Sequence, residues 1–274
     1  MDATGGKELA RFGVSSITSR SRQYARKRSP RHILLTRDGV RIEAEHHGAL
    51  NGSEDLAVVL AHGFTGSLDR PAVRRAARAF RGYGGVVTFS FRGHGGSGGR
   101  STVGDREVLD VDAAVGWARR LGYRRVATVG FSMGGSVVLR QAAAREVPVD
   151  AVVSVSAPAR WYYRGTAPMR RLHWVVTGRV GRTVSRYGLR TRIHPEGWDP
   201  VPVPPVEAVR FIAPTPLLIV HGDRDAYFPL DHPRSLAAAA GDRAELWIEP
   251  GFAHAENSAS PALLSRIGTW LTAT

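Results

Sequence analysis

The sequence contains no cysteine. This absence excludes disulfide bonds, thiolate metal sites and a cysteine nucleophile, so any covalent catalysis must use another residue. Long apolar runs are also absent, because the longest, Leu56–Ala61, is far shorter than the roughly 20 residues that a membrane-spanning helix needs. The basic N-terminus is not followed by an apolar stretch of about 7 to 15 residues, as a secretory signal would be. We therefore expect a cytoplasmic protein.

Lysine is scarce, although the chain is strongly basic. The formal net charge is +14, and among the 38 basic residues only Lys7 and Lys27 are lysines. The charge is concentrated in two segments: residues 1–31 hold eight basic and two acidic residues, and residues 151–195 hold nine arginines and no acid. The rest of the chain is nearly neutral. Two explanations stay open, namely an anionic partner and the arginine bias of a GC-rich genome.

Length and composition fit one large globular domain. The chain has 274 residues, of which 43% are hydrophobic and 23% are charged. A chain of this length buries roughly 75% of its unfolded surface. Intrinsic disorder and a coiled coil are both excluded by this composition.

The order of the apolar segments predicts an α/β sandwich. A hairpin opens it, with strands at Ile33–Thr36 and Val40–Glu45 around an Asp-Gly turn. Six short apolar strands then alternate with helical stretches. The expected strands are Leu56–Ala61, Val86–Phe89, Val126–Val129, Ala151–Val155, Pro216–Val220 and Glu245–Ile248, and the expected helices lie near 71–82, 105–121, 133–146, 231–240 and 260–272. Continuous apolar runs indicate strands buried on both faces, so we expect a mostly parallel, eight-stranded sheet flanked by helices.

Two segments depart from this alternation. Residues 1–30 are rich in Ser, Arg and Gly and are interpreted as a basic, flexible arm. Residues 158–210 lack a strand and are interpreted as a small helical cap inserted into a core formed by 31–157 and 211–274. Thr166 and Pro168 predict the start of a cap helix. Its expected apolar stripe consists of Met169, Leu172, Val176, Val180, Val184 and Tyr187, with Gly178 and Gly181 as weak points.

The pentapeptide Gly130-Phe131-Ser132-Met133-Gly134 lies between a predicted strand and a predicted helix. A serine in this setting sits on a sharp turn, where small flanking residues relieve crowding and the hydroxyl is exposed at the carboxyl edge of the sheet. Ser132 is therefore the candidate nucleophile.

Four further motifs follow the expected strands in order. They are His62-Gly63-Phe64, Arg92-Gly93-His94-Gly95, His221-Gly222-Asp223-Arg224-Asp225 and Gly251-Phe252-Ala253-His254. With the Ser132 turn, they make residues 31–272 resemble the α/β-hydrolase family, and more specifically bacterial esterases and monoacylglycerol lipases. The resemblance implies the order nucleophile, acid, histidine along the chain.

That order makes His254 the candidate base, because the loop after the last strand returns it to Ser132. The acid is Asp225 or Asp223. We favour Asp225, because proteins that resemble this one place the acid two residues before a short hydrophobic-Pro turn, as in Asp225-Ala226-Tyr227-Phe228-Pro229. The backbone N–H groups of Met133 and Phe64 are the candidate oxyanion donors. Phe64 is also a candidate wall residue of the pocket. No metal or other cofactor is expected.

Aromatic and apolar side chains of the cap are candidate substrate-binding residues: Trp161, Met169, His173 and Trp174. The cap arginines would face an anionic substrate or lipid headgroups; alternatively, they are solvated and contact nothing in particular. We therefore expect a serine hydrolase of carboxylic esters, with a small-molecule acyl ester as substrate and peripheral contact with an anionic membrane. Thioester or amide substrates stay open. The rival is a non-catalytic binding protein on the same scaffold, recruited to anionic membrane or, with less support, to nucleic acid.

Overall fold

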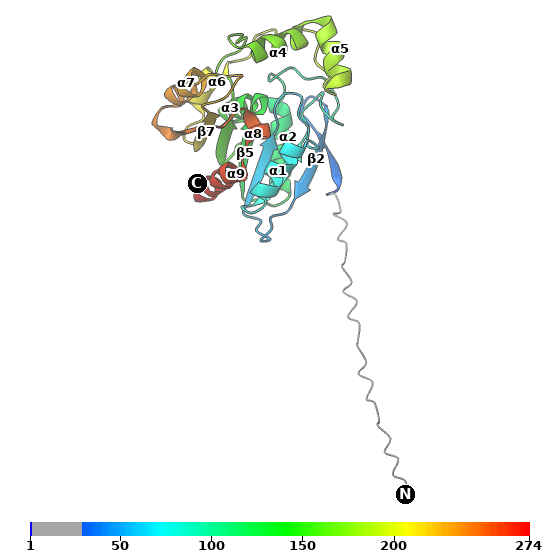
Figure 1. Cartoon of the computed structure of the whole chain (residues 1–274), viewed down its shortest axis with the longest axis vertical. Coiled ribbons are helices and arrows are strands. Elements are labelled where there is room, and N and C mark those ends of the chain that lie inside the picture. Colours follow the sequence, from blue (N-terminus) through cyan, green and yellow to red (C-terminus); the bar gives the residue numbers. More distant parts are fainter. Residues whose placement is uncertain (2–28) are drawn as a thin grey trace.

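A single eight-stranded sheet runs through the molecule (Figure 1). The computed structural model describes Met1 and residues 29–274, so the interpretation of residues 1–30 as a basic arm falls almost entirely outside the described residues. The strand order is β1-β2-β4-β3-β5-β6-β7-β8. The strands are β1 (Arg31–Leu35), β2 (Arg41–His47), β3 (Leu56–Ala61), β4 (Gly85–Phe89), β5 (Arg125–Phe131), β6 (Ala151–Val155), β7 (Leu217–Gly222) and β8 (Ala244–Glu249).

Strand direction follows the prediction. Strands β1 and β2 pair as an antiparallel hairpin, β2 is antiparallel to β4, and every pair from β4 to β8 is parallel. The predicted mostly parallel sheet with an antiparallel start is therefore confirmed. All parallel strands point their carboxyl ends to the same edge, where the loops that carry chemistry gather.

Helices cover both faces of the sheet. On β3, Val58 packs with Ala76 of α1 and Leu264 of α9, whereas the next residue, Val59, packs with the opposite layer, which includes Val115 of α2. This alternation explains why β3 reads as a continuous apolar run. The helices of the two layers are α1 (Pro71–Phe80), α8 (Ala255–Ser258) and α9 (Pro261–Ala273) on one side and α2 (Val108–Arg120), α3 (Met133–Ala144) and α7 (Asp231–Ala240) on the other.

The segment between β6 and β7 carries α4 (Ala167–Thr177), α5 (Arg179–Gly188) and α6 (Pro205–Ala208). Figure 1 shows α4 and α5 set apart from the sheet, above its upper edge, whereas α6 packs on α3 and α7. Thr166 caps α4 as expected, because its hydroxyl accepts a hydrogen bond from the Met169 N–H. No helix in the described part of the chain is long and apolar enough to cross a membrane.

The single cap helix expected from the apolar stripe is wrong in its second half. Gly178 has an extended backbone, with φ −79° and ψ 141°, and this ends α4 and starts α5 in a new direction. The stripe therefore holds only along α4. On α5 its members are exposed, at 65% for Val180, 48% for Val184 and 74% for Tyr187.

Candidate active site

Ser132 occupies the sharp turn between β5 and α3. Its backbone has φ 52° and ψ −115°, a strained conformation for a residue with a side chain. A Cβ on Gly130 would collide with the backbone of Gly134, and one on Gly134 would collide with the carbonyl of Ala61. The two flanking glycines are therefore required by close backbone approach, and the turn holds the Ser132 hydroxyl at the sheet edge.

The three side chains singled out for catalysis form one hydrogen-bonded chain. His254 Nε2 lies 2.9 Å from Ser132 Oγ, and His254 Nδ1 lies 2.8 Å from Asp225 Oδ2. Since a carboxylate only accepts hydrogen bonds, Nδ1 carries a proton and the neutral ring presents an unprotonated Nε2 to the serine. The ring also stacks on Tyr227, with centroids 4.2 Å apart. The arrangement orients a base toward a hydroxyl nucleophile.

Asp225 is held as an ionised carboxylate. Burial acts to raise the pKa of Asp225, but the hydrogen bond and charge of His254, together with the Tyr227 N–H, outweigh it and bring the pKa below its usual value. The second carboxylate oxygen accepts the Tyr227 and Phe228 N–H groups at 2.8 and 3.1 Å. Asp223, the alternative acid, instead accepts the Gly251 N–H at 2.7 Å and does not contact His254.

Two backbone amides beside Ser132 are left without acceptors. Neither the Met133 nor the Phe64 N–H hydrogen-bonds to any described residue. Met133 is the first residue of α3, so its N–H points out of the positive end of that helix. Unpaired amides next to a nucleophile are suited to stabilising an oxyanion.

Two buried histidines hold the Phe64 loop. His62 Nδ1 lies 2.7 Å from the Gly63 carbonyl, and His62 Nε2 accepts the Phe91 N–H at 3.0 Å. His94 likewise donates to the Arg92 carbonyl and accepts the Thr65 N–H at 3.3 Å. Each ring uses one proton and one lone pair, so only the neutral form satisfies both bonds. Burial lowers the pKa of His62 to about 3 and that of His94 to about 4.

We expect the free energy of unfolding to fall between pH 7 and pH 5. Both histidines have a lowered pKa when folded, so below about 6.5 the unfolded chain takes up protons that the folded protein does not. The loss at pH 5 is roughly 2 kcal/mol for each histidine. Urea unfolding at both pH values measures it, and His62→Gln should reduce the dependence only in part, because His94, His47 and His232 also have a lowered pKa. Equal stability of the wild-type protein at the two pH values would contradict the assignment.

Glu256, which the sequence analysis missed, lies on the other side of the same loop. Its buried carboxylate accepts the Gly63 N–H at 3.0 Å, and burial raises the pKa of Glu256. Gly63 directly precedes Phe64. The contact therefore fixes the chain just before a candidate oxyanion donor. In the sequence, the only signal for Glu256 is its position two residues after His254.

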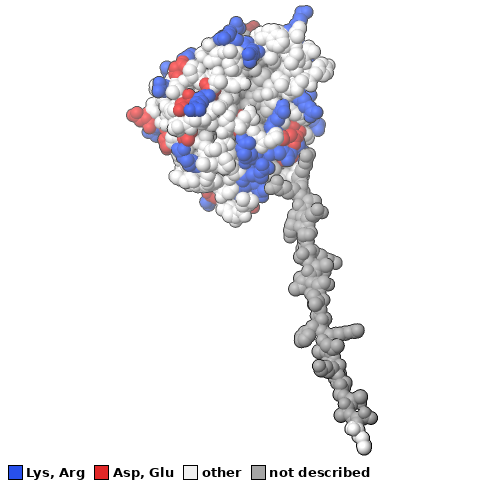
Figure 2. Space-filling model, viewed as in Figure 1, with Lys and Arg blue, Asp and Glu red and all other residues white. Residues whose placement is uncertain are grey.

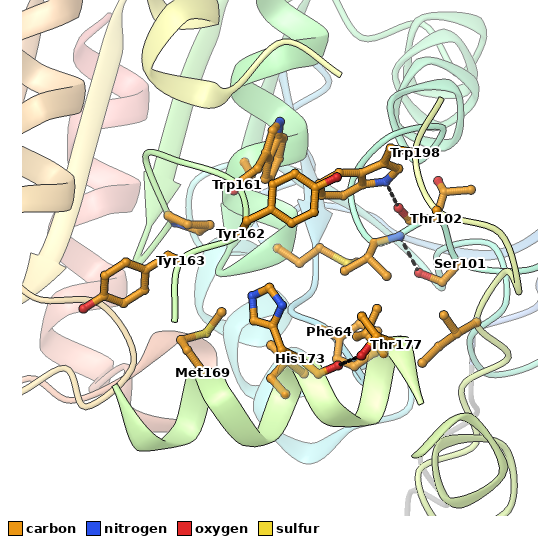
Figure 3. Close-up of a pocket in the computed structure, with 18 of the residues that line it drawn as sticks. Phe64, Ser101, Thr102, Trp161, Tyr162, Tyr163, Met169, His173, Thr177 and Trp198 are labelled. Atoms are coloured by element: carbon orange, nitrogen blue, oxygen red, sulfur yellow. Dashed lines mark hydrogen bonds between the residues drawn. The ribbon is translucent and has the colours of Figure 1, made fainter. Parts of the chain in front are cut away.

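A cavity of about 300 Å³ opens from Ser132 toward the cap (Figure 3). Its walls include Phe64, Met133, Trp161, Met169 and His173, so five of the residues singled out from the sequence are brought together here. Figure 3 shows Met169 and His173 on the helix below the cavity, with Trp161 across from them. The lining is largely aromatic and aliphatic, which suits an acyl group.

The structure does not place Trp174 in this cavity. Its side chain is 54% exposed on the outer side of α4. Trp198 lines the cavity instead, although the sequence analysis overlooked it: its ring lies 5.1 Å from that of Trp161, and its Nε1 donates to the Thr102 carbonyl at 2.6 Å. Trp198 belongs to a proline-rich stretch without periodicity, which carries no signal for a pocket residue.

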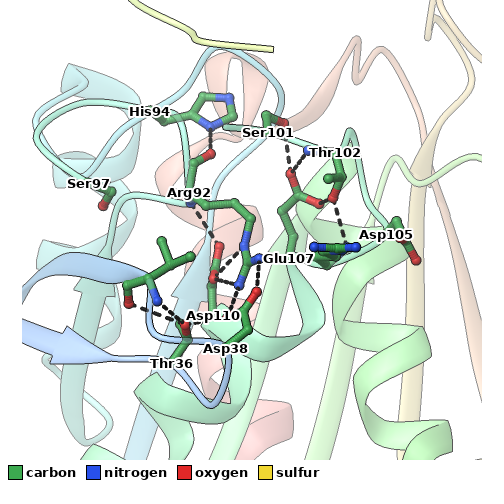
Figure 4. Close-up of polar contacts among 12 residues, drawn as sticks. Thr36, Asp38, Arg92, His94, Ser97, Ser101, Thr102, Asp105, Glu107 and Asp110 are labelled. Atoms are coloured by element: carbon green, nitrogen blue, oxygen red, sulfur yellow. Dashed lines mark hydrogen bonds and ion pairs between the residues drawn. The ribbon is translucent and has the colours of Figure 1, made fainter. Parts of the chain in front are cut away.

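Buried carboxylates fix the loop that forms another wall of the cavity (Figure 4). Glu107 accepts hydrogen bonds from the hydroxyls of Ser101 and Thr102 and from the Thr102 and Gly104 N–H groups, at 2.7 to 2.9 Å. Arg92 lies between Asp38 and Asp110 in the same view. The Arg92-Gly93-His94-Gly95 motif is thus structural, and it supports the strand ends from which the cavity loops leave.

The sequence itself matches a known family: the model of the alpha/beta hydrolase fold family matches residues 57–171. This chain has the α/β-hydrolase fold. The human protein ABHD12B is 30% identical to it over 202 residues, which are 68% of this chain and 52% of ABHD12B. The chain therefore spans about half the length of that relative.

Solved structures of other proteins share this fold over most of the chain. Esterase Pf2001 from Pyrococcus furiosus is 24% identical and superposes with a TM-score of 0.71, covering 90% of this chain and 91% of that one. XC6422 from Xanthomonas campestris, an α/β serine hydrolase without a lid, is 22% identical with a TM-score of 0.58, covering 90% and 93%. At these identities the likeness establishes the fold, and the chemistry must be argued from this chain's own residues.

Proposed function

We propose that this α/β-hydrolase-fold protein is a serine hydrolase that cleaves carboxylic esters through an acyl-enzyme. The observation that carries the proposal is the hydrogen-bonded chain Ser132–His254–Asp225 at the mouth of an apolar cavity, beside two unpaired amides. A non-catalytic binding protein would need neither the strained serine nor the oriented histidine. The esterase relatives in structure are consistent with this activity.

In the first half-reaction, Ser132 Oγ attacks the ester carbonyl while its proton passes to His254 Nε2. The imidazolium that forms is stabilised by the ionised Asp225. The carbonyl oxygen becomes an oxyanion within reach of the Met133 and Phe64 N–H groups, and donors of this kind are each worth about 3 to 4 kcal/mol. His254 then protonates the leaving alcohol as the carbon–oxygen bond breaks.

In the second half-reaction, His254 takes a proton from water, and the resulting hydroxide attacks the acyl-enzyme. The same two amides stabilise the second tetrahedral intermediate. Collapse returns the proton to Ser132 and releases the carboxylic acid, so bonds and charges balance over the cycle.

The cavity favours acyl groups that are apolar and of moderate size. Its walls of Trp161, Met169, Leu172 and Trp198 offer little hydrogen bonding to a chain placed between α4 and the sheet edge. Thioesters share the same tetrahedral intermediate and remain within the proposal.

Pre-steady-state hydrolysis of p-nitrophenyl esters with different acyl lengths tests the proposal. We expect a burst of p-nitrophenol, or, if deacylation is fast, a mass increase equal to the acyl group on rapid acid quench. The longest acyl chains that the cavity holds should give the highest kcat/KM. The absence of turnover for every acyl length, with the protein folded, would refute the esterase assignment.

We further propose that α5 contacts an anionic membrane surface. Val180, Val184 and Tyr187 form an exposed apolar face, and Arg186 lies beside them on the same helix. Figure 2 shows basic side chains at several places on the face in view, including the top, where α4 and α5 lie. An apolar face bordered by arginines is typical of interfacial helices.

Replacing Val184 and Tyr187 together with serine should weaken binding to vesicles of anionic phospholipid by about 10-fold, because two apolar side chains no longer enter the interface. Vesicle sedimentation in low salt measures this. Leu50→Ser, at a similarly exposed apolar position on a distant loop, is the matched control and should bind like the wild type. Equal binding of all three proteins would contradict the membrane proposal.

A further inference from the structure

Five arginines line a second cavity beside the first. It has a volume of about 280 Å³ and lies between α5 and the loops that follow β4 and α5. Apart from Thr183 and Ile193, its lining residues are all arginines: Arg100, Arg179, Arg182, Arg186 and Arg192. Such a concentration of positive charge in a concave site is unfavourable unless something neutralises it.

No carboxylate in residues 29–274 neutralises these arginines. None of the five takes part in any ion pair of that part of the chain, and residues 151–195 contain no acidic residue at all. The guanidinium of Arg182 donates to the Thr177 carbonyl at 2.7 Å and that of Arg192 donates to the Ser97 carbonyl, whereas the side chains of Arg100, Arg179 and Arg186 make no hydrogen bond within the described residues. Donors therefore remain free to bind a ligand.

The backbone around the cavity is firmly held. The Arg192 carbonyl accepts the Ser101 N–H at 2.7 Å, and the Arg192 N–H donates to the Gly93 carbonyl at 2.8 Å. Gly93 has φ +76°, and any side chain there would collide with the Ser101 amide. The three arginines that α5 contributes to the cavity, Arg179, Arg182 and Arg186, are spaced three and four residues apart, so they share one helix face. Two segments distant in sequence thus present their guanidinium groups to one space.

The arginine cavity adjoins the cavity at Ser132. Arg182 and Ile193 line both, so they form a shared wall. A ligand whose acyl carbonyl lies at Ser132 would reach the arginines by extending past this wall. The two cavities differ in chemistry, one largely apolar and one basic, and together they match a molecule with an acyl end and an anionic end.

We propose that the arginine cavity binds a phosphate group carried by the substrate, so that the preferred substrate is an acyl ester or thioester of a phosphorylated compound. This inference rests on the proposed esterase function. Phosphate fits better than a carboxylate, because it offers more acceptor oxygens and up to two negative charges to several guanidinium groups. If the arginines of this cavity only contact water, the protein would show no preference for phosphorylated over neutral esters.

Two soluble substrates that differ only in the phosphate test this directly: 1-butyrylglycerol and 1-butyrylglycerol 3-phosphate. At low ionic strength the KM of the phosphorylated ester should be lower by about 10-fold or more, since each charge-assisted bond contributes to binding. The advantage should shrink in 0.5 M salt, because exposed charges are screened within about 10 Å already at 0.1 M. Equal KM values in low salt would overturn the proposal.

Substitutions locate the effect. The double variant Arg100→Gln, Arg186→Gln removes two arginines that line only the second cavity, and it should abolish the KM advantage. Arg171→Gln, an exposed arginine of α4 that lines neither cavity, is the matched control and should retain it. A double variant that keeps the full advantage would show that the phosphate binds elsewhere.

Inorganic phosphate separates a substrate-borne group from a free effector. Phosphate should compete with the phosphorylated ester and leave the hydrolysis rate of 1-butyrylglycerol unchanged. If phosphate changes that rate while the wild type shows no preference for the phosphorylated ester, the cavity is an effector site and the substrate assignment is overturned.

If the wild type hydrolyses no ester, the proposed function fails, and the cavity is tested separately by calorimetric titration of Ser132→Ala with inorganic pyrophosphate. Binding that the double variant loses supports the site, and no binding overturns it.

Discussion

Replacing Ser132 with alanine is expected to lower kcat for ester hydrolysis on the order of 10³-fold or more, because no other group can form the acyl-enzyme. The hydroxyl contacts His254 Nε2 at 2.9 Å and makes no second side-chain hydrogen bond. Alanine keeps the Cβ that the turn already accommodates, so the fold should persist. Initial rates with a p-nitrophenyl ester measure the effect, and a thermal melt confirms folding.

Residual activity near the wild-type rate, with contaminating esterases excluded by a second purification, would remove Ser132 from the mechanism. A large loss of thermal stability would instead assign the serine a structural role.

The second large effect is expected for Asp225→Asn, which should reduce kcat by about 10⁴-fold. An amide can donate a hydrogen bond to His254 Nδ1, and the ring proton would then sit on Nε2, facing the serine that it should deprotonate. The asparagine oxygen still accepts the Tyr227 and Phe228 N–H groups, so the loop should stay in place.

Asp223→Asn is the matched control, two residues away in the same loop. Asp223 accepts only the Gly251 N–H, and an amide oxygen preserves that bond. Its kcat should stay within a few-fold of the wild type. Comparable losses in the two variants, or the reverse ranking, would contradict the assignment of Asp225.

The core and the sharp turn at Ser132 could be predicted because their signals are local. Val58 and Val59 on β3 are buried on opposite faces, so the strand reads as an unbroken apolar run. The turn at Ser132 needs small neighbours, and Gly130 and Gly134 supply them within five residues. His254 could be singled out because it follows the last expected strand and fits the chain order that the resemblance to the α/β-hydrolase family implies.

The cap was predicted less well, because its packing depends on contacts distant in sequence. The apolar spacing of Val180 and Tyr187 resembles a buried face, but nothing in the described chain covers α5 there. Trp198 enters the cavity through its contact with Thr102, nearly a hundred residues earlier. The arginine cavity likewise brings Arg100 next to the arginines of α5. The number of charged residues in each segment does not indicate that these side chains lie together.

Labelling with a fluorophosphonate probe, followed by peptide mass spectrometry, tests the central claim most directly. The probe reacts only with a serine whose proton a base can remove. The account predicts one phosphonylated residue, Ser132, in the wild-type protein, with labelling strongly reduced in His254→Gln and absent in Ser132→Ala. A folded wild-type protein that takes up no probe, or one labelled on a different serine, would contradict it.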